Sequence, residues 1–207
     1  MANKKRQIKK FQQSAAPIIF VIALIVIGGG FWVRGLLDHV SRTTDQPTTQ
    51  SSQLSATQLK QRRFIRKLAT PAVRVYHSNR QVLPSIVIAQ AIIESSWGDS
   101  QLFKEANNPF GMKGSYNGQT KLYPTAEVYN GKRVMINDYF RVYPNLQAAI
   151  VDHDTVVADK FVPAGTTDYA VAARALQNNG YATDPNYAAK VIHVIDAYRL
   201  TRFDTTQ

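Results

Sequence analysis

One predicted β-hairpin limits the fold of this chain more than any other sequence feature. Two strand-like runs, TKLYPTAEVY and KRVMINDYFRVY, flank Asn130 and Gly131. Asn-Gly is the preferred two-residue turn of a hairpin because both of its positions accept a positive φ angle. No other segment shows a convincing strand pattern, so the rest of a folded domain is expected to be helical.

Helical patterns lie on both sides of the hairpin. Residues 59–79 carry apolar side chains at helical spacing, and Pro71 within them predicts a break or a kink. Pro84 suits the first turn of a helix that continues over residues 86–94, and an Asn- and Gly-rich loop follows at residues 107–116. Further helices are predicted over residues 145–158, 169–176 and 188–200. The fold class is therefore α+β, a mostly helical domain with a small inserted β-hairpin lobe.

A long uncharged segment near the N-terminus predicts a membrane anchor. Residues 14–33 contain no charged side chain, and their number is close to the ~20 that a helix needs to cross a bilayer. Five basic residues precede the segment, so the positive-inside rule keeps the N-terminus in the cytoplasm and places the remainder outside the cell. The alternative is a signal peptide whose cleavage releases a secreted protein, but no clear A-x-A site follows the apolar run.

The chain accordingly divides into four parts. We expect a basic cytoplasmic N-terminus at residues 1–13, a transmembrane helix at 14–35, a flexible Ser/Thr/Gln-rich tether at 36–58 and one folded domain at 59–207. The tether has too few apolar residues to fold, and as a random coil it spans about 25 Å. We therefore expect the folded domain to act close to the membrane.

Composition and charge indicate which partners the chain suits and exclude several kinds of site. The net charge is +11, and residues 59–207 hold 18 Lys or Arg against 12 Asp or Glu, a net charge of +6. Such a domain suits an anionic wall polymer or membrane surface, whereas no basic block outside the N-terminus resembles a nucleic-acid-binding arm. The absence of cysteine excludes disulfides, Cys-ligated zinc and a thiol nucleophile. The four histidines are scattered, so no metal site is predicted.

Glu94 is the first candidate for chemistry, because it ends the apolar segment LPSIVIAQAIIE. An apolar environment disfavours the charged form of a carboxyl group and raises its pKa, as an acid catalyst requires. Helical spacing places Gln90, Glu94 and Trp97 on one face, where an amide, an acid and an indole could bind a sugar. The alternative is that Trp97 anchors the core and Glu94 ends in solvent.

Other candidates lie outside this helix. Glu127 and Tyr129 share one face of the first strand, and a hairpin that folds over the helix would bring Glu127 across a cleft from Glu94. Two carboxyl groups across a cleft are the usual requirement of glycoside hydrolysis, although Glu127 alone could be a solvated hairpin residue. Tyr181 in NNGYATDPNY could orient a substrate or pack in the core, and Asp184 suits a helix N-cap.

Four sequence blocks occur together in one order: LPSIVIAQAIIESSWGDS, ANNPFGMKG, TAEVYNGKRV with FRVY, and NNGYATDPNYAAKVIHVIDAYRL. In this order they resemble the bacterial peptidoglycan glucosaminidases of glycoside hydrolase family 73, and the match covers residues 64–204. The resemblance implies a lysozyme-like fold. It also implies an endo-β-N-acetylglucosaminidase activity that cleaves the glycan strands of peptidoglycan after N-acetylglucosamine, with no metal or organic cofactor.

The resemblance also implies roles for individual residues. Glu94 matches the general acid of the family, Glu127 matches a second acid whose place varies among members, and Tyr181 matches a tyrosine near the scissile sugar. Together with the spacing argument, the positions expected to bind substrate are Gln90, Trp97, Asn108, Phe110 and Tyr129.

Several alternatives stay open at this point. The same fold hosts lytic transglycosylases and muramidases, which cleave after N-acetylmuramic acid, and a tethered wall-binding protein without catalysis would share the same groove. Hydrolysis can invert, retain or use the N-acetyl group of the substrate. The choice depends on the separation of the two carboxyl groups, which the sequence does not give.

Overall fold

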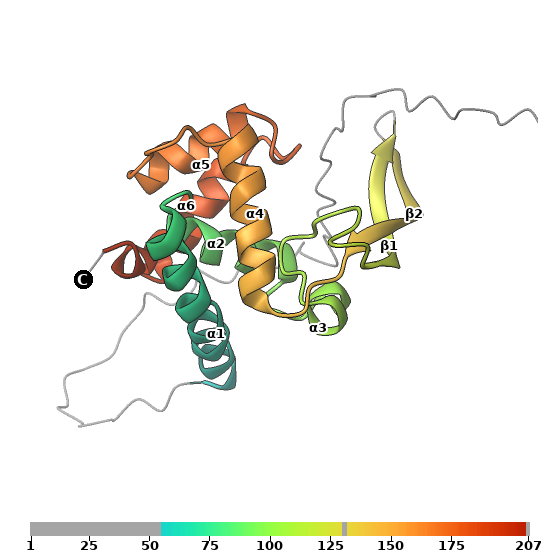
Figure 1. Ribbon diagram of the computed structural model, residues 1–207, viewed down its shortest axis with the longest axis horizontal. Helices are drawn as coiled ribbons and strands as arrows, with labels where there is room; N and C mark the ends of the chain where they lie inside the picture. Colours follow the sequence, from blue (N-terminus) through green and yellow to red (C-terminus); the bar gives the residue numbers. More distant parts are fainter. Residues whose placement is uncertain (1–54, 130–131, 206–207) are drawn as a thin grey trace, which may run out of the picture.

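The computed structural model describes residues 55–129 and 132–205, and for residues 127–129 and 132–133 it describes the backbone alone. Helices make up most of this part of the chain, and its only sheet is a two-stranded antiparallel hairpin, as the sequence predicts. In Figure 1 the larger helices gather into one body, and the hairpin projects from its side next to the short helix α3. The elements in chain order are α1 (Ala56–Asn79), α2 (Pro84–Ser95), α3 (Gln101–Ala106), β1 (Thr120–Tyr129), β2 (Lys132–Arg141), α4 (Leu146–Lys160), α5 (Tyr169–Asn178), α6 (Tyr187–Ala197) and the 3₁₀ helix η1 (Leu200–Phe203).

The register of the hairpin agrees with the predicted Asn-Gly connection. The pairing runs from Thr120 opposite Arg141 to Tyr129 opposite Lys132, so two residues separate the strands. This spacing is the one that a two-residue hairpin turn requires. The predicted strands and their register are therefore confirmed.

Helix α1 differs from the prediction at its start and in its middle. Ser55 and Gln58 form a reciprocal capping box, so the helix begins at Ala56 and includes the last three residues of the predicted tether. The helix also continues unbroken past Pro71, so of the predicted break or kink the break is wrong. Residues on both sides of the proline, Leu68 and Ala72 among them, are buried in the core, and this packing outweighs the hydrogen bond that proline removes.

Helix α2 is the centre of the core. Residues 84–92 are all buried, and the helix contacts α1, α5, α6 and η1. A helix that is apolar around its whole circumference must be surrounded by protein, which explains this position. Pro84 occupies the first turn as predicted. The functional consequence is that Glu94, in the last turn of α2, emerges directly from the core.

The predicted membrane anchor falls in a part of the chain that the structure does not describe. The predicted transmembrane helix at residues 14–35 falls outside the described residues, as does the tether up to residue 54. Among residues 55–129 and 132–205, no helix combines the length and the apolar character that a bilayer span needs.

Candidate active site

Glu94, Tyr187 and Gln90 form a hydrogen-bonded chain that joins α2 to α6. The Tyr187 hydroxyl donates to Glu94 Oε1 over 2.9 Å, and Gln90 Nε2 donates to the same hydroxyl oxygen over 3.2 Å. Gln90 and Tyr187 are fully buried, so the predicted contact of Gln90 with a substrate is corrected: its amide binds Tyr187 instead. An amide nitrogen only donates, so the phenol oxygen accepts from Gln90 and its proton points to Glu94. The arrangement holds the Glu94 carboxyl group in one orientation.

The environment of Glu94 raises the pKa of its carboxyl group towards neutral pH. The residue is partly exposed, yet protein atoms enclose its carboxyl group, and this burial raises its pKa to about 7. The hydrogen bond from Tyr187 and the positive charge of Lys190 act in the opposite direction, but burial dominates. The prediction that the apolar setting of Glu94 raises its pKa is thus supported by the structure.

Tyr181 lies beside this chain and is as deeply buried as Tyr187. Its ring centroid is 5.5 Å from that of Tyr187 and 5.2 Å from that of Phe161, and only 1% of the residue is exposed. Burial and the nearby charge of Glu94 raise the pKa of Tyr181 well above its ordinary value. Tyr181 therefore stays a neutral phenol near the acid, and its burial fits the alternative in which it packs in the core, so its role towards the substrate stays a prediction.

The segment between the two tyrosines is held by an ion pair. Asp184 accepts a hydrogen bond from the Asn186 amide over 2.9 Å and pairs with Lys190 Nζ at 2.6 Å. The N-cap of α6 is Asn186, so the predicted capping role of Asp184 is wrong by two residues. Asp184 instead fixes the turn that carries Tyr181 and Tyr187 to the end of α2.

Trp97 does not share a helical face with Glu94. Helix α2 ends at Ser95, and the next two residues have positive φ angles of 51° and 62°, which turn the chain away from the helix axis. The indole packs edge-on against Tyr198 at 4.8 Å and against Phe64 at 6.3 Å. The structure thus favours the alternative in which Trp97 anchors the core.

Asn108 and Phe110 are buried, so neither offers a surface to a substrate. Asn108 donates to the carbonyls of Met112 and Arg141 and accepts from the Met112 amide, at 2.9 to 3.0 Å. Phe110 stacks on the buried His153 ring with centroids 3.9 Å apart. Their predicted place in the lining of the groove is corrected, because both shape the loop that leads into the hairpin.

Glu127 and Tyr129 are described only by their backbone. Glu127 lies in β1 opposite Val134, two residues from the end of the strand. The side chains of both residues are outside the described part, so their predicted roles stay predictions.

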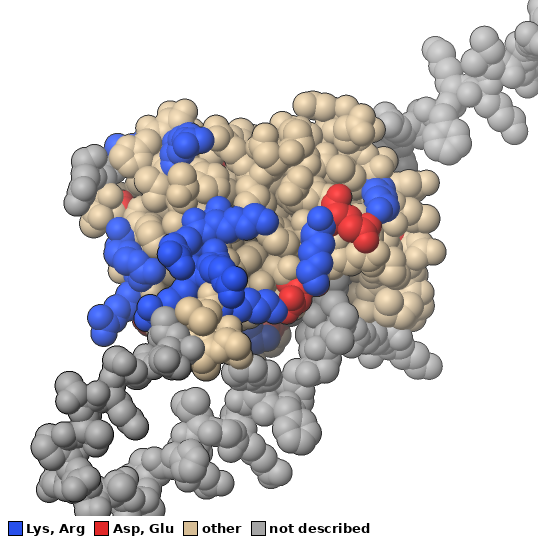
Figure 2. Space-filling view, turned by 90° about the horizontal axis from the view of Figure 1, so that it is seen from below, with Lys and Arg blue, Asp and Glu red and all other residues tan. Residues whose placement is uncertain are grey.

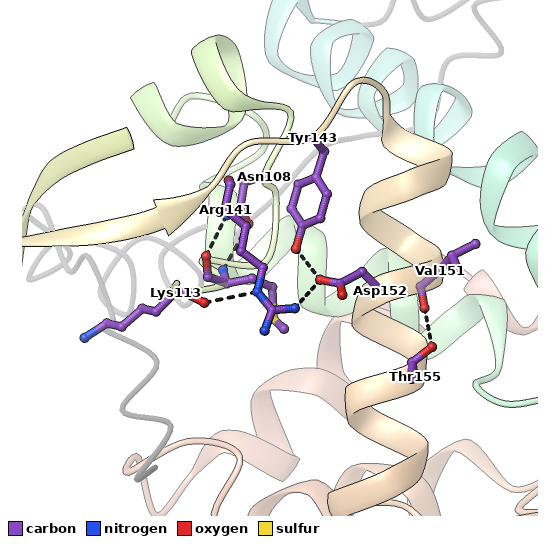
Figure 3. Close-up of polar contacts among 8 residues, drawn as sticks. Asn108, Lys113, Arg141, Tyr143, Val151, Asp152 and Thr155 are labelled. Carbon is purple, nitrogen blue, oxygen red and sulfur yellow. Dashed lines mark hydrogen bonds and ion pairs between the residues drawn. The ribbon is translucent and has the colours of Figure 1, made fainter. Parts of the chain in front are cut away.

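The base of the hairpin is anchored to α4 by a polar cluster that the sequence did not predict. Figure 3 shows Asp152 on α4 reaching the Arg141 guanidinium and the Tyr143 hydroxyl. The Tyr143 hydroxyl donates to Asp152 Oδ2 over 2.6 Å, and Arg141 Nη1 pairs with the same oxygen. Arg141 also donates through Nε to the Lys113 carbonyl over 3.1 Å. The cluster sets the direction in which β1 and β2 leave the helical body.

The described residues contain no cluster of three or more His, Cys, Asp or Glu side chains that could hold a metal ion.

The contact of Tyr187 with Glu94 was not predicted from the sequence. Its spacing with Val191 and Ile195 indicates a buried face of α6, but that pattern does not tell which groups the hydroxyl meets.

Comparisons with known proteins find relatives in sequence and in fold. A family model described as mannosyl-glycoprotein endo-beta-N-acetylglucosaminidase matches residues 70–200. The chain is 41% identical over 149 residues to the exo-glucosaminidase LytG of Bacillus subtilis, covering 68% of this chain and 52% of that protein. It is 35% identical over 212 residues to a probable N-acetylmuramidase of Lactococcus lactis, covering 97% of this chain and 47% of that protein. The chain thus spans about half the length of these two relatives.

A solved structure has the same fold. The catalytic domain of the autolysin Auto from Listeria monocytogenes superposes with a TM-score of 0.65 at 33% identity. The superposition covers 73% of this chain and 91% of that domain.

Proposed function

Because the chain belongs to the glucosaminidase family, we propose that it is a peptidoglycan hydrolase that cleaves glycan strands after N-acetylglucosamine. The resemblance to family 73 that the four sequence blocks indicate is confirmed. The single observation that carries the activity is the Glu94 carboxyl group, which burial holds near half-protonation at neutral pH. A general acid works best when its pKa lies near the working pH.

Glu94 would donate its proton to the glycosidic oxygen. Oε1 already accepts the Tyr187 proton, so the acidic proton belongs on Oε2. The neutral phenol of Tyr181 would adjoin the acid from the core side, since its ring packs on that of Tyr187. Glu127, at the far end of β1, would stabilise the developing positive charge or activate water.

The bond that is cleaved can be read from the reducing ends of the products. The test is mass spectrometry of borohydride-reduced peptidoglycan after digestion with the full-length chain in a non-ionic detergent. Reduced N-acetylglucosamine ends that disappear with Glu94→Gln would support the proposal. New ends in N-acetylmuramic acid, reduced or anhydro, would instead favour the second candidate, a muramidase or lytic transglycosylase, in line with the name of the Lactococcus relative. Intact glycan that still binds the protein would favour a wall-binding role.

We further propose that the protein is membrane-anchored with its folded domain outside the cell. The uncharged run at residues 14–33 and the basic residues before it support this orientation. Since α1 begins at Ala56, the tether would comprise residues 36–55 and span about 25 Å as a random coil.

Membrane fractionation checks the anchor. A mature protein that starts beyond residue 35 would show that the chain is secreted instead. Shortening residues 41–54 is expected to reduce activity in cells, and indifference to this deletion would contradict the short reach.

Tyr187→Phe is expected to move the pH dependence of cleavage upward. The Tyr187 hydroxyl stabilises the ionised form of Glu94, so its removal raises the pKa of the acid. The alkaline limb of the kcat/KM profile, where Glu94 loses its proton, should shift to higher pH, and kcat should fall about tenfold because the carboxyl group loses its fixed orientation. Tyr169→Phe, which removes a tyrosine–carboxylate hydrogen bond to Asp196 elsewhere, is the matched control. An unchanged profile for Tyr187→Phe would contradict this role.

A further inference from the structure

A pocket between α1 and η1 is lined by arginine side chains from both elements. Its volume is about 640 Å³. In Figure 1, η1 lies on the side of the helical body opposite the hairpin. Figure 2 views the molecule from below, and most of the Lys and Arg side chains on this face gather in the left half of the picture. The residues that line the pocket are Arg62, Ile65, Arg66, Ala197, Tyr198, Arg199 and Arg202.

The positive charge of this pocket is not neutralised by the described part of the protein. None of its four guanidinium groups forms an ion pair with a described carboxylate. Asp196 and Asp204, which are close to it in sequence, accept hydrogen bonds from Tyr169 and Ser85 instead. The positive charges of neighbouring arginines repel one another. An anion bound in the pocket would reduce this repulsion in the folded protein.

The guanidinium group of Arg202 is held in place by backbone carbonyls and by a neighbouring ring. Arg202 Nη1 donates to the Tyr198 carbonyl over 2.5 Å and to the Arg199 carbonyl over 2.7 Å, and its guanidinium lies 4.5 Å from the Phe203 ring centroid. Arg199 has a left-handed backbone with φ 49°, which turns the chain at the start of η1. Preorganised guanidinium groups lose less entropy on binding, and their planar fork matches phosphate oxygens.

The opposite wall of the pocket belongs to α1. Arg62 and Arg66 are four residues apart on α1, so their side chains project from the same face of the helix. The floor contains the buried Ile65 and the ring of Tyr198, which packs against Trp97. Four arginines from two sides therefore line a space much larger than one phosphate group.

We propose that this pocket binds a phosphodiester-linked anionic polymer, with successive phosphates held by arginines of the two walls. Guanidinium groups spread over two walls favour a chain with several phosphates over a single small anion. A concave pocket with its charges inside also suits a flexible polymer better than the flat headgroup layer of a bilayer. The pocket is separate from Glu94, so the inference does not depend on which glycosidic bond is cleaved.

The test compares two variants that lose the same charge. Binding of a linear poly(glycerol phosphate) to the full-length chain in a non-ionic detergent is measured by titration calorimetry. Arg66→Gln with Arg199→Gln is expected to weaken binding about tenfold, since each exposed contact contributes a fraction of the total affinity. Arg74→Gln with Arg174→Gln removes the same charge outside the pocket and should change the affinity less than about twofold. Thermal unfolding of each variant verifies that both remain folded.

Three results would overturn the proposal. Equal weakening by the two double variants would mean attraction to overall charge, and no weakening by either would mean that the polymer binds elsewhere, for example at the basic N-terminus. The third is pocket-dependent binding to phosphatidylglycerol vesicles without binding of the polymer, which would identify a membrane-docking surface. Binding of the polymer but not of inorganic phosphate or polyglutamate supports recognition of successive phosphodiesters.

Discussion

Replacing Glu94 with glutamine is expected to lower kcat/KM for peptidoglycan cleavage by about 10²–10⁴-fold, the usual contribution of a general acid. The substitution keeps the size of the side chain and an oxygen that accepts the Tyr187 proton, so the site should keep its shape. It removes only the proton that the leaving oxygen needs. Release of soluble glycan fragments from purified peptidoglycan, measured over a range of substrate concentrations, checks the loss.

Glu105→Gln is the matched control for this experiment. Glu105 is an exposed residue of α3 that pairs with Lys121 at 2.5 Å, away from the Glu94 site. Its replacement should leave kcat/KM within about twofold of the parent value, because an exposed ion pair contributes little. If Glu94→Gln kept more than about a tenth of the parent activity, Glu94 would not be the general acid.

The same substitution is expected to stabilise the fold at alkaline pH. Burial raises the pKa of Glu94 from 4.5 to about 7, so the folded state binds the proton more tightly than the unfolded state does. The stability that comes from this proton is fully present below pH 4.5 and is lost as the pH rises through 7. Above pH 7 the parent bears a cost of up to about 3 kcal/mol that glutamine avoids. Denaturant unfolding at pH 5 and pH 8 should therefore show a gain for Glu94→Gln that grows with pH.

Asp152→Ala is expected to destabilise the protein by about 2 kcal/mol, since it leaves the Arg141 guanidinium and the Tyr143 hydroxyl without their shared acceptor. Both charged side chains are 19% exposed, so water compensates only part of the loss. The melting temperature should fall by about 6 °C in a domain of this size. Asp152→Asn keeps an oxygen for Tyr143 and should lose less.

Asp152→Ala is also expected to loosen the hairpin, because the polar cluster lies at its base. Because Asp152 fixes the base of the hairpin on α4, its loss should also raise the hydrogen-exchange rate of the amides in β1 and β2. Asp159→Ala, which changes an exposed acid on the same helix, should affect neither the melting temperature nor the exchange. Equal effects of the two substitutions would show that the polar cluster does not anchor the hairpin.

Local signals in the sequence predicted the parts of the fold that depend on near neighbours. Asn130 and Gly131 between two strand-like runs predict the hairpin and its register, and both strands are found there. Pro84 and the apolar run after it predict a buried helix that ends in an acid. The raised pKa of Glu94 follows from the same pattern, because a carboxyl group at the end of a fully buried helix cannot be well hydrated.

The failures of sequence reasoning are equally informative. Trp97 fits the helical spacing of Gln90 and Glu94, but two left-handed residues after Ser95 redirect the chain, and no periodicity shows where a helix stops. Pro71 should interrupt α1, yet the buried residues around it keep the helix continuous. In both cases contacts with distant segments outweigh a local preference.

The sequence by itself therefore determined the fold class, the family and the position of Glu94 at the end of a buried helix, since these depend on short patterns of polarity, turn residues and motif order. Only the tertiary structure decided how the acid is held: Tyr187, 93 residues from Glu94 along the chain, donates the hydrogen bond that orients the carboxyl group. It likewise brought Arg62 and Arg66 of α1 next to Arg199 of the C-terminal segment. These contacts between distant residues arise because the helices must bury their apolar faces together. No local sequence pattern predicts which polar groups come into contact as a result.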